Sequence, residues 1–292
     1  MTIISLFSCS GAPGATTVAL ATTAGLTATS VHEPVMIEMA ASGGVLASQY
    51  DLPSEPGLMS LALAIGNDYP DLLEHAQELP GGVPVVVAPP SSSKTTKLLD
   101  ARAVPLARYL QETPATIVAD CGRVSPATNL LPILELSSLI GLVIRPTRES
   151  FQLAATTINE LNELTPDPLP VGWILVGHCP WSHDEIISQY GVPVFGVVAE
   201  DRVGAEAVAG LRRLRKHSPL ARSAQSFAED LAKHLRIASI SRPLGYLEDE
   251  ASSAESTETA EPEWVAQAEV LPYDAPVADD LTFDDASQAA AQ

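Results

Sequence analysis

The chain has 292 residues, of which 46% are hydrophobic, so it is long and apolar enough for one large globular domain or two smaller ones. Its formal net charge of −20 disfavours binding to nucleic acid or to an anionic membrane surface, and no apolar run approaches the roughly 20 residues that a membrane-spanning helix needs. No basic segment followed by an apolar one opens the chain, so we expect a cytoplasmic protein.

A glycine-containing stretch follows the first expected strand, residues 2–7, and precedes an expected helix, residues 16–29. This order of strand, glycine loop and helix is typical of a phosphate-binding P-loop. In such a loop, backbone N–H groups surround phosphate oxygens, a lysine reaches the β- and γ-phosphates, and a Ser or Thr hydroxyl binds Mg²⁺. The stretch contains glycines and hydroxyls but no lysine, and small residues at this place also serve close packing of a strand against a helix.

The stretch resembles the deviant Walker A loop of the MinD/ParA family, K-G-G-x-G-K-T. Gly11, Gly14 and Thr16 match that pattern, whereas Ser10 and Ala15 stand where the family has its two lysines, and Ala12 replaces a glycine. The resemblance implies ATP and Mg²⁺ as weakly held cofactors. It also implies that the nucleotide is contacted by Gly11, Ala12, Pro13, Gly14, Ala15, Thr16 and Thr17.

The next expected strand, residues 35–39, is followed by a turn. In the family this strand commonly ends in an acid-x-Asp pair, and the Asp lies near the attacking water. Glu38 fits the first acid, but Ala40 stands at the second, so we interpret this strand end as one that lacks that chemistry. Two or three short helices are expected over 46–80, then a buried strand over 83–90. A helix should run from the Ser91 region, which offers an N-cap, to about Leu110.

Residues 116–122 form the second informative stretch, an apolar strand that ends in Asp120 and Gly122. It fits a Walker B strand, whose carboxylate faces the Mg²⁺ shell at the end of the sheet where ligands bind. A strand that merely ends in an Asp turn is the competing interpretation. The resemblance implies that Thr16 and Asp120 hold the metal and that Asp120 is the catalytic carboxylate.

The remaining chain repeats the alternation of strands, over 139–144, 172–177 and 192–198, with helices over 148–164 and 218–235. In the last helix, apolar residues three or four positions apart predict one core-facing side: Leu220, Ala224, Phe227, Leu231 and Leu235. In the family, the loops after the last two strands frame the adenine base. The resemblance therefore places His178, Glu200 and Asp201 at the nucleotide, while His178 equally fits a histidine at a loop edge.

Together these patterns predict an α/β fold of the P-loop NTPase type, with a mostly parallel sheet of about seven strands and helices on both faces. We expect residues 1–243 to form this domain and residues 244–292 to be a disordered acidic tail. The tail holds 13 of the 36 acidic residues and has no Lys or Arg after Arg242. Apolar residues interrupt it at Trp264, Tyr273 and Phe283, so short docking motifs are one interpretation and a solvated tail is the other.

The resemblance implies a role in bacterial cell organisation, with the fold serving as a positioning and partner-recruiting module. Because Ser10, Ala15 and Ala40 replace residues that the family's hydrolysis uses, we predict weak or absent ATP hydrolysis. Arg123, Arg145 and Arg148 are candidate substitutes for the missing charge. The alternative is an active Mg-dependent ATPase with an atypical loop, working in partitioning, septum placement or pilus and secretion localisation.

A homodimer and a protein partner, bound through the body and the acidic tail, are the expected associations. DNA binding would rest on Arg212, Arg213, Arg215 and Lys216, but basic residues near a helix C-terminus are also favoured by the helix dipole. A membrane-binding helix at the C-terminus would be basic and amphipathic, whereas this C-terminus is acidic. We therefore expect neither nucleic acid nor membrane as a partner.

Overall fold

The computed structural model describes residues 2–10, 14–29, 34–66, 69–80, 82–211 and 218–241. The strands are β1 (Thr2–Ser8), β2 (Pro34–Glu38), β3 (Gln77–Leu79), β4 (Val83–Val86), β5 (Thr116–Arg123), β6 (Leu139–Ile144), β7 (Val171–Val176) and β8 (Val194–Val198). The helices are α1 (Ala15–Thr29), α2 (Leu46–Gln49), α3 (Leu58–Ala64), the 3-10 helix η1 (Leu72–His75), α4 (Ser92–Glu112), α5 (Leu131–Glu135), α6 (Arg148–Asn162), α7 (His183–Tyr190), α8 (Arg202–Val208) and α9 (Pro219–Ser241).

The described strands form one sheet in the order β3-β4-β2-β5-β1-β6-β7-β8. Seven of them are parallel, and only β3 runs antiparallel, against β4. The predicted α/β fold with a mostly parallel sheet is confirmed, and its strand count is eight because of β3. This strand lies inside the stretch 46–80, where we expected only short helices. It is three residues long and has no hydrophobic alternation of its own, so the local sequence gives little sign of it.

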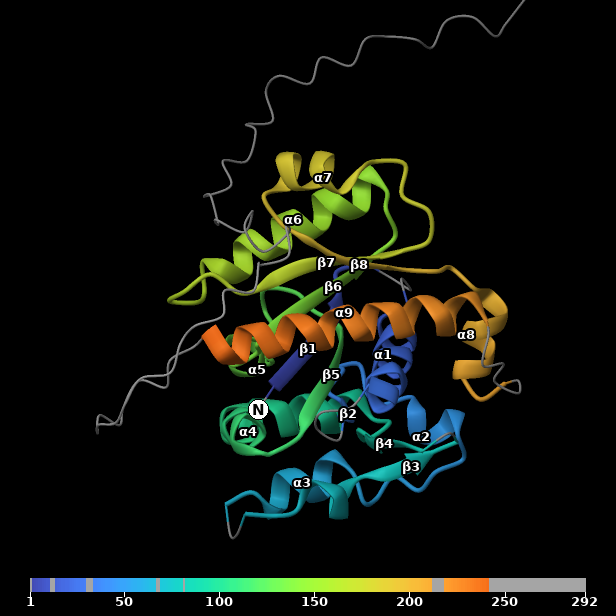
Figure 1. Ribbon diagram of the computed structural model, residues 1–292. Coiled ribbons are helices and arrows are strands. Elements are labelled where there is room, and N and C mark those ends of the chain that lie inside the picture. Colours follow the sequence, from blue (N-terminus) through green and yellow to red (C-terminus); the bar gives the residue numbers. More distant parts are fainter. Residues whose placement is uncertain are drawn as a thin grey trace, which may run out of the picture.

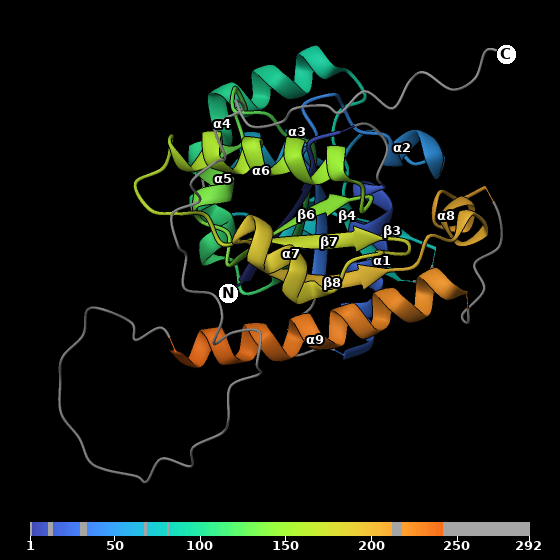
Figure 2. The same ribbon diagram turned by 90° about the horizontal axis from the view of Figure 1, so that it is seen from above.

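Helices cover both faces of the sheet, as Figure 2 shows with α9 on one side and α4 and α6 on the other. Alternate residues of β1 point to opposite layers, since Ile4 and Leu6 pack with α1 and α9, whereas Ile3 and Phe7 pack with α3 to α7. The five apolar positions predicted for the last helix, 220, 224, 227, 231 and 235, are all buried in α9. Their spacing alone therefore identified the core-facing side of this helix.

The close approach of α9 to α1 depends on a glycine. A Cβ placed on Gly25 would lie 2.8 Å from the Cβ of Ala228 and 3.2 Å from the carbonyl oxygen of Ala224. The C-terminal helix therefore covers the helix that begins at the glycine loop (Figure 1). Among the described helices, none has the length and apolar character needed to cross a bilayer. The predicted tail, the basic run 212–217 and the boundary at residue 243 lie outside the described residues.

Candidate functional site

The candidate site lies at the carboxyl end of β1, in the middle of the sheet. β1 is hydrogen-bonded to β5 on one side and to β6 on the other. From β1 the chain continues through α1 to β2 on the β5 side, whereas β6 leads to β7 and β8 on the opposite side. In open α/β sheets this change of direction opens a crevice outside the carboxyl ends of the strands, and ligands bind there.

The described part of the glycine loop has the geometry of a turn into a helix. Gly14 has φ of +89°, a conformation that L side chains rarely adopt, and α1 begins at the next residue. The first backbone hydrogen bond of α1 runs from the N–H of Val18 to the carbonyl of Gly14, at 2.9 Å. By helix geometry, the N–H groups of Ala15, Thr16 and Thr17 have no acceptor within α1 and are directed at the end of the loop. The predicted contacts Gly11, Ala12 and Pro13 lie outside the described residues.

The structure brings Thr16 and Asp120 together, although they are far apart in the sequence. The Thr16 hydroxyl lies close enough to the Asp120 carboxylate to act on its pKa, and the carboxylate accepts the N–H of Gly122 at 3.0 Å. Asp120 is 1% exposed, and its burial raises the pKa of the carboxyl, while the Thr16 hydroxyl and the Gly122 N–H oppose the rise. A nearby cation would favour the charged form. A hydroxyl and a carboxylate are oxygen donors of the kind that Mg²⁺ takes, so these two residues fit the implied metal.

Glu38 is equally buried, but its carboxylate accepts hydrogen bonds from three backbone N–H groups. Its Oε1 accepts the N–H groups of Val45 at 2.7 Å and Leu46 at 3.0 Å, and its Oε2 accepts the N–H of Ala88 at 3.0 Å. Burial raises the pKa of Glu38 despite these bonds, and the charge of Asp120 adds to the rise. The carboxylate therefore ties the loop after β2 to the end of β4, and three of its acceptor positions are already used. Sequence reasoning missed this structural role.

Ala40 lies beside the candidate metal ligands. A Cβ placed on Gly122 would come within 2.6 Å of the Ala40 Cβ, which shows how close the ends of β2 and β5 are. The position where the family has a second acid thus lies against Gly122, two residues after Asp120, and here it is an alanine that is 9% exposed. At this place the chain has no carboxylate to orient a water molecule.

Positive charge around the loop comes from neighbouring strands. Arg123 is the partner of Ser8 in the pairing of β5 with β1, and its guanidinium lowers the pKa of Cys9, although burial has the larger effect and raises that pKa to about 11. Arg145, at the end of β6, pairs with Glu200 at 2.8 Å. Both arginines were candidate substitutes for the missing lysines. Arg145 is engaged by Glu200, whereas Arg123 lies next to the strand that enters the loop.

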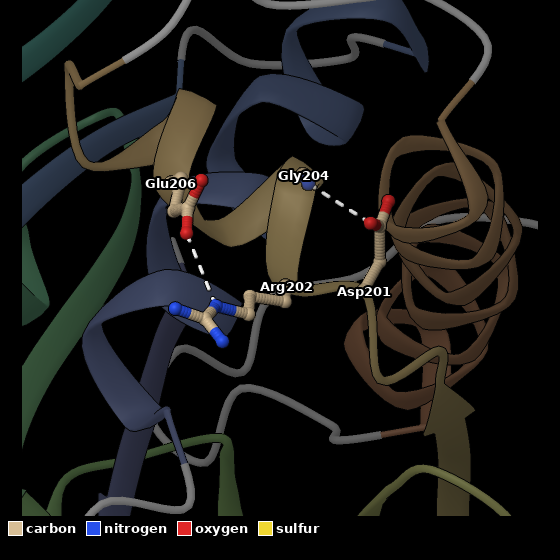
Figure 3. A network of polar contacts seen from close by, with 4 residues as sticks. All are labelled: Asp201, Arg202, Gly204 and Glu206. Carbon is tan, nitrogen blue, oxygen red and sulfur yellow. Dashed lines mark hydrogen bonds and ion pairs between the residues drawn. The ribbon is translucent and has the colours of Figure 1, made fainter.

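Three residues were expected at the adenine base: His178 and Glu200 lie in adjacent loops, whereas Asp201 caps a helix. His178 is exposed and follows Gly177, and a Cβ placed on Gly177 would be 3.3 Å from Glu200. The loops after β7 and β8 therefore lie side by side. Asp201, in contrast, is the N-cap of α8, and its Oδ1 accepts the N–H of Gly204 at 2.9 Å (Figure 3). Its Oδ2 accepts the N–H of Leu220 at 3.3 Å. These contacts fix the start of α8 and α9.

Comparison with known proteins was made at the level of sequence and of structure. No protein-family model matches the chain, and no curated protein sequence matches it. Among solved structures it is similar to a ParA family ATPase from Chlorobium tepidum TLS, with a TM-score of 0.67 and 17% identity over 79% of this chain and 98% of that chain.

Two further solved structures carry names from cell division. The septum site-determining protein MinD from Pyrococcus horikoshii OT3, complexed with Mg-ADP, has a TM-score of 0.64 and 17% identity over 81% of this chain and 98% of that chain. The MinC:MinD cell division protein complex of Aquifex aeolicus gives a TM-score of 0.59 and 13% identity over 84% of this chain and 99% of that chain. The chain therefore has the MinD/ParA-like P-loop fold that its glycine loop and Asp120 strand predicted.

Proposed function

We propose that this protein is a degenerate MinD/ParA-like positioning module in bacterial cell organisation, which binds ATP and Mg²⁺ weakly and hydrolyses ATP very slowly or not at all. The observation that carries the proposal is the combination of a preserved turn from Gly14 into α1 with the loss of the loop's charge. Gly14 turns the chain into α1 and Thr16 lies close to Asp120, yet Ala15 stands at the position of the catalytic lysine.

The expected loss of affinity follows from electrostatics. Two unit charges about 4 Å apart interact by roughly 4 kcal/mol at an effective dielectric constant near 20. Solvent and counterions reduce this value, but each 1.4 kcal/mol still changes a dissociation constant about tenfold. The N–H groups at the start of α1 continue to favour an anion. Nucleotide binding weakened by several tens of fold is the expected result.

Hydrolysis is affected more than binding. Phosphoryl transfer depends on charges that stabilise the transition state, and on a group that orients the attacking water. Ser10 and Ala15 carry no charge, and Ala40 brings a methyl group next to Gly122, at the end of the Asp120 strand. These three replacements concern separate parts of the reaction, so their effects on the rate combine.

The second candidate function is an active Mg-dependent ATPase. The closeness of Thr16 to Asp120 favours it, because the two residues supply two oxygen donors of the kind that Mg²⁺ takes. Arg123 would then supply positive charge from β5. Phosphate release that disappears in Asp120→Ala would establish this function in place of the first.

The deciding experiment measures binding of a fluorescent ATP analogue to the full-length protein, with and without Mg²⁺. Weak binding is expected, and both Gly14→Val and Thr16→Ala should abolish it. Thr27→Ala, on the exposed side of the same helix, is the matched control and should bind like the wild type. Ala15→Lys should tighten binding at least tenfold, since it restores the charge. Absence of binding up to millimolar nucleotide in both wild type and Ala15→Lys would contradict the proposal and would mean that the loop has only a structural role.

The partner in this proposal is a protein. One structural neighbour is named a MinC:MinD cell division protein complex, and the acidic tail of this chain offers apolar residues in a charged context. A homodimer is expected as the working form, with its role in septum placement, partitioning, or pilus and secretion localisation. The charge of the tail argues against DNA and anionic membranes as alternatives.

Deleting residues 244–292 should abolish recruitment of the protein partner while the body stays folded. The body holds the whole described core, so its melting temperature should change little. Co-localisation of the partner with full-length and truncated protein in cells measures recruitment, and circular dichroism measures folding. Recruitment that survives the truncation would assign the partner to the body.

A further inference from the structure

A groove lies between the end of α3 and the C-terminal half of α4, away from the glycine loop. It encloses about 480 Å³. Its apolar lining comes from both segments, with Ile65 and Tyr69 on one wall and Val104, Pro105 and Tyr109 on the other. Tyr69 is 58% exposed and Val104 is 49% exposed, so much of this apolar surface faces solvent. Exposed apolar surface of this kind marks an interaction site.

Hydrogen bonds hold the tyrosine walls of the groove in place. The hydroxyl of Tyr69 donates to the Glu112 carboxylate at 3.1 Å, and its ring lies 5.1 Å from the ring of Tyr109. The hydroxyl of Tyr109 donates in turn to the carbonyl of Pro70 at 2.8 Å. The groove is therefore formed before any partner arrives, which lowers the entropy cost of binding.

Charges of both signs lie around the groove. Arg108 and Glu112 line it, Arg102 reaches the neighbourhood of Gly66, and the charge of Asp71 acts on Tyr109. Glu112 accepts the hydroxyl of Tyr69, whereas among the described residues neither Arg102 nor Arg108 forms an ion pair. A peptide with two carboxylates and a bulky apolar side chain complements these two arginines and the apolar walls.

The chain itself contains such a peptide. Residues 261–265 read Glu-Pro-Glu-Trp-Val, with two glutamates among the three residues before a tryptophan, in a tail that has no Lys or Arg after Arg242. This segment lies outside the described residues. From the end of α9 at Ser241 to Trp264 there are 23 residues, which span up to about 75 Å when extended, more than the width of a domain of this size.

We infer that the groove between α3 and α4 binds the 261–265 segment of the same chain, with Trp264 between Tyr69 and Val104 and the two glutamates facing Arg108 and Arg102. A tethered segment has an effective concentration on the order of a millimolar, so contacts too weak to hold a free peptide suffice. Docking holds the tail against the body, so a partner protein that binds the tail must first release segment 261–265 from the groove. The inference does not depend on nucleotide binding.

Fluorine NMR of the full-length protein labelled with 5-fluorotryptophan tests this docking. The chain has three tryptophans, and two of them, Trp173 and Trp181, lie in or against the hydrophobic core. Trp264→Phe assigns the third signal. In the wild type the Trp264 signal should have the linewidth of the folded body. In Val104→Asp and in Arg108→Glu it should narrow at least twofold, as expected of a free tail.

Controls separate loss of docking from unfolding of the body and from association between chains. The signals of Trp173 and Trp181 report folding in every variant, and Arg222→Glu, an exposed arginine of α9, should leave the Trp264 signal unchanged. Linewidths independent of protein concentration support docking within one chain. A Trp264 signal that is already narrow in the wild type, or that broadens only at high concentration, would overturn the inference.

Discussion

At the residue scale, two buried carboxylates lie on neighbouring strands and have different roles. Glu38 and Asp120 pair with one another in the β2–β5 register, and each is 1% exposed. Glu38 is satisfied by three backbone N–H groups, whereas Asp120 accepts one backbone N–H and has the Thr16 hydroxyl nearby. A buried acid with remaining acceptor capacity costs stability, and such groups are typical of functional sites.

Asp120→Asn should stabilise the protein at neutral pH. The folded-state pKa of Asp120 lies above its ordinary value of 3.8, so the unfolded chain loses the proton first and stability falls as pH rises from about that value. Asparagine does not ionise, so the variant does not lose stability as pH rises, and its side-chain oxygen can still accept the N–H of Gly122. Urea unfolding at pH 4 and pH 7.5 checks the prediction: the gain over wild type should be large at pH 7.5 and nearly absent at pH 4. An equal gain at both values would contradict it.

At the element scale, side-chain caps define where helices begin. Ser91 begins α4, as its sequence position predicted, Thr147 begins α6 and Ser182 begins α7. Asp201 differs from these because it accepts one N–H from α8 and another from Leu220 in α9. It therefore connects two helices that are separated by residues 209–218.

Asp201→Ala should lower the free energy of unfolding by about 0.5–2 kcal/mol, the usual cost of losing an N-cap. The N–H groups of Gly204 and Leu220 lower the pKa of Asp201, so its contribution is present above pH 3.8 and disappears as pH falls further. Amide hydrogen exchange should become faster at the starts of both α8 and α9. Ser182→Ala is the control: it should cost a similar amount and affect α7 alone.

At the scale of the whole molecule, the last helix covers the first. α9 lies across α1 on one face of the sheet, and Gly25 allows the two helices to approach (Figure 2). The helix that starts at the candidate nucleotide site is thereby fixed by a segment more than 190 residues later in the chain. A shift of α9 would move α1, and with it Thr16.

Gly25→Ala should destabilise the protein by about 1–3 kcal/mol, as overpacking does, although alanine normally stabilises a helix relative to glycine. Its Cβ would lie 2.8 Å from that of Ala228. Adding Ala228→Gly should recover part of the loss, so a double-mutant cycle measured by thermal unfolding should show a favourable coupling. Additive effects of the two substitutions would mean that α1 and α9 adjust independently.

Much of the fold followed from local patterns. The apolar runs located seven strands, and the glycine loop and the Asp120 strand identified the fold that the solved structures confirm. Sequence reasoning missed β3, α5 and α7, which are short. It also missed the pairing of Arg145 with Glu200 and the groove beside α4, because each forms between segments that no local pattern relates.

The sequence by itself determined the fold class and the absence of charge in the candidate nucleotide loop, because periodicity and residue identity are local properties. Only the tertiary structure decided which residues meet. Strand order places β5 beside β1 and so brings Asp120 to Thr16, and the same order leaves Ala40 at the neighbouring position. It also showed that Glu38 and Asp201 serve the backbone, because their acceptors meet N–H groups that folding brings to them.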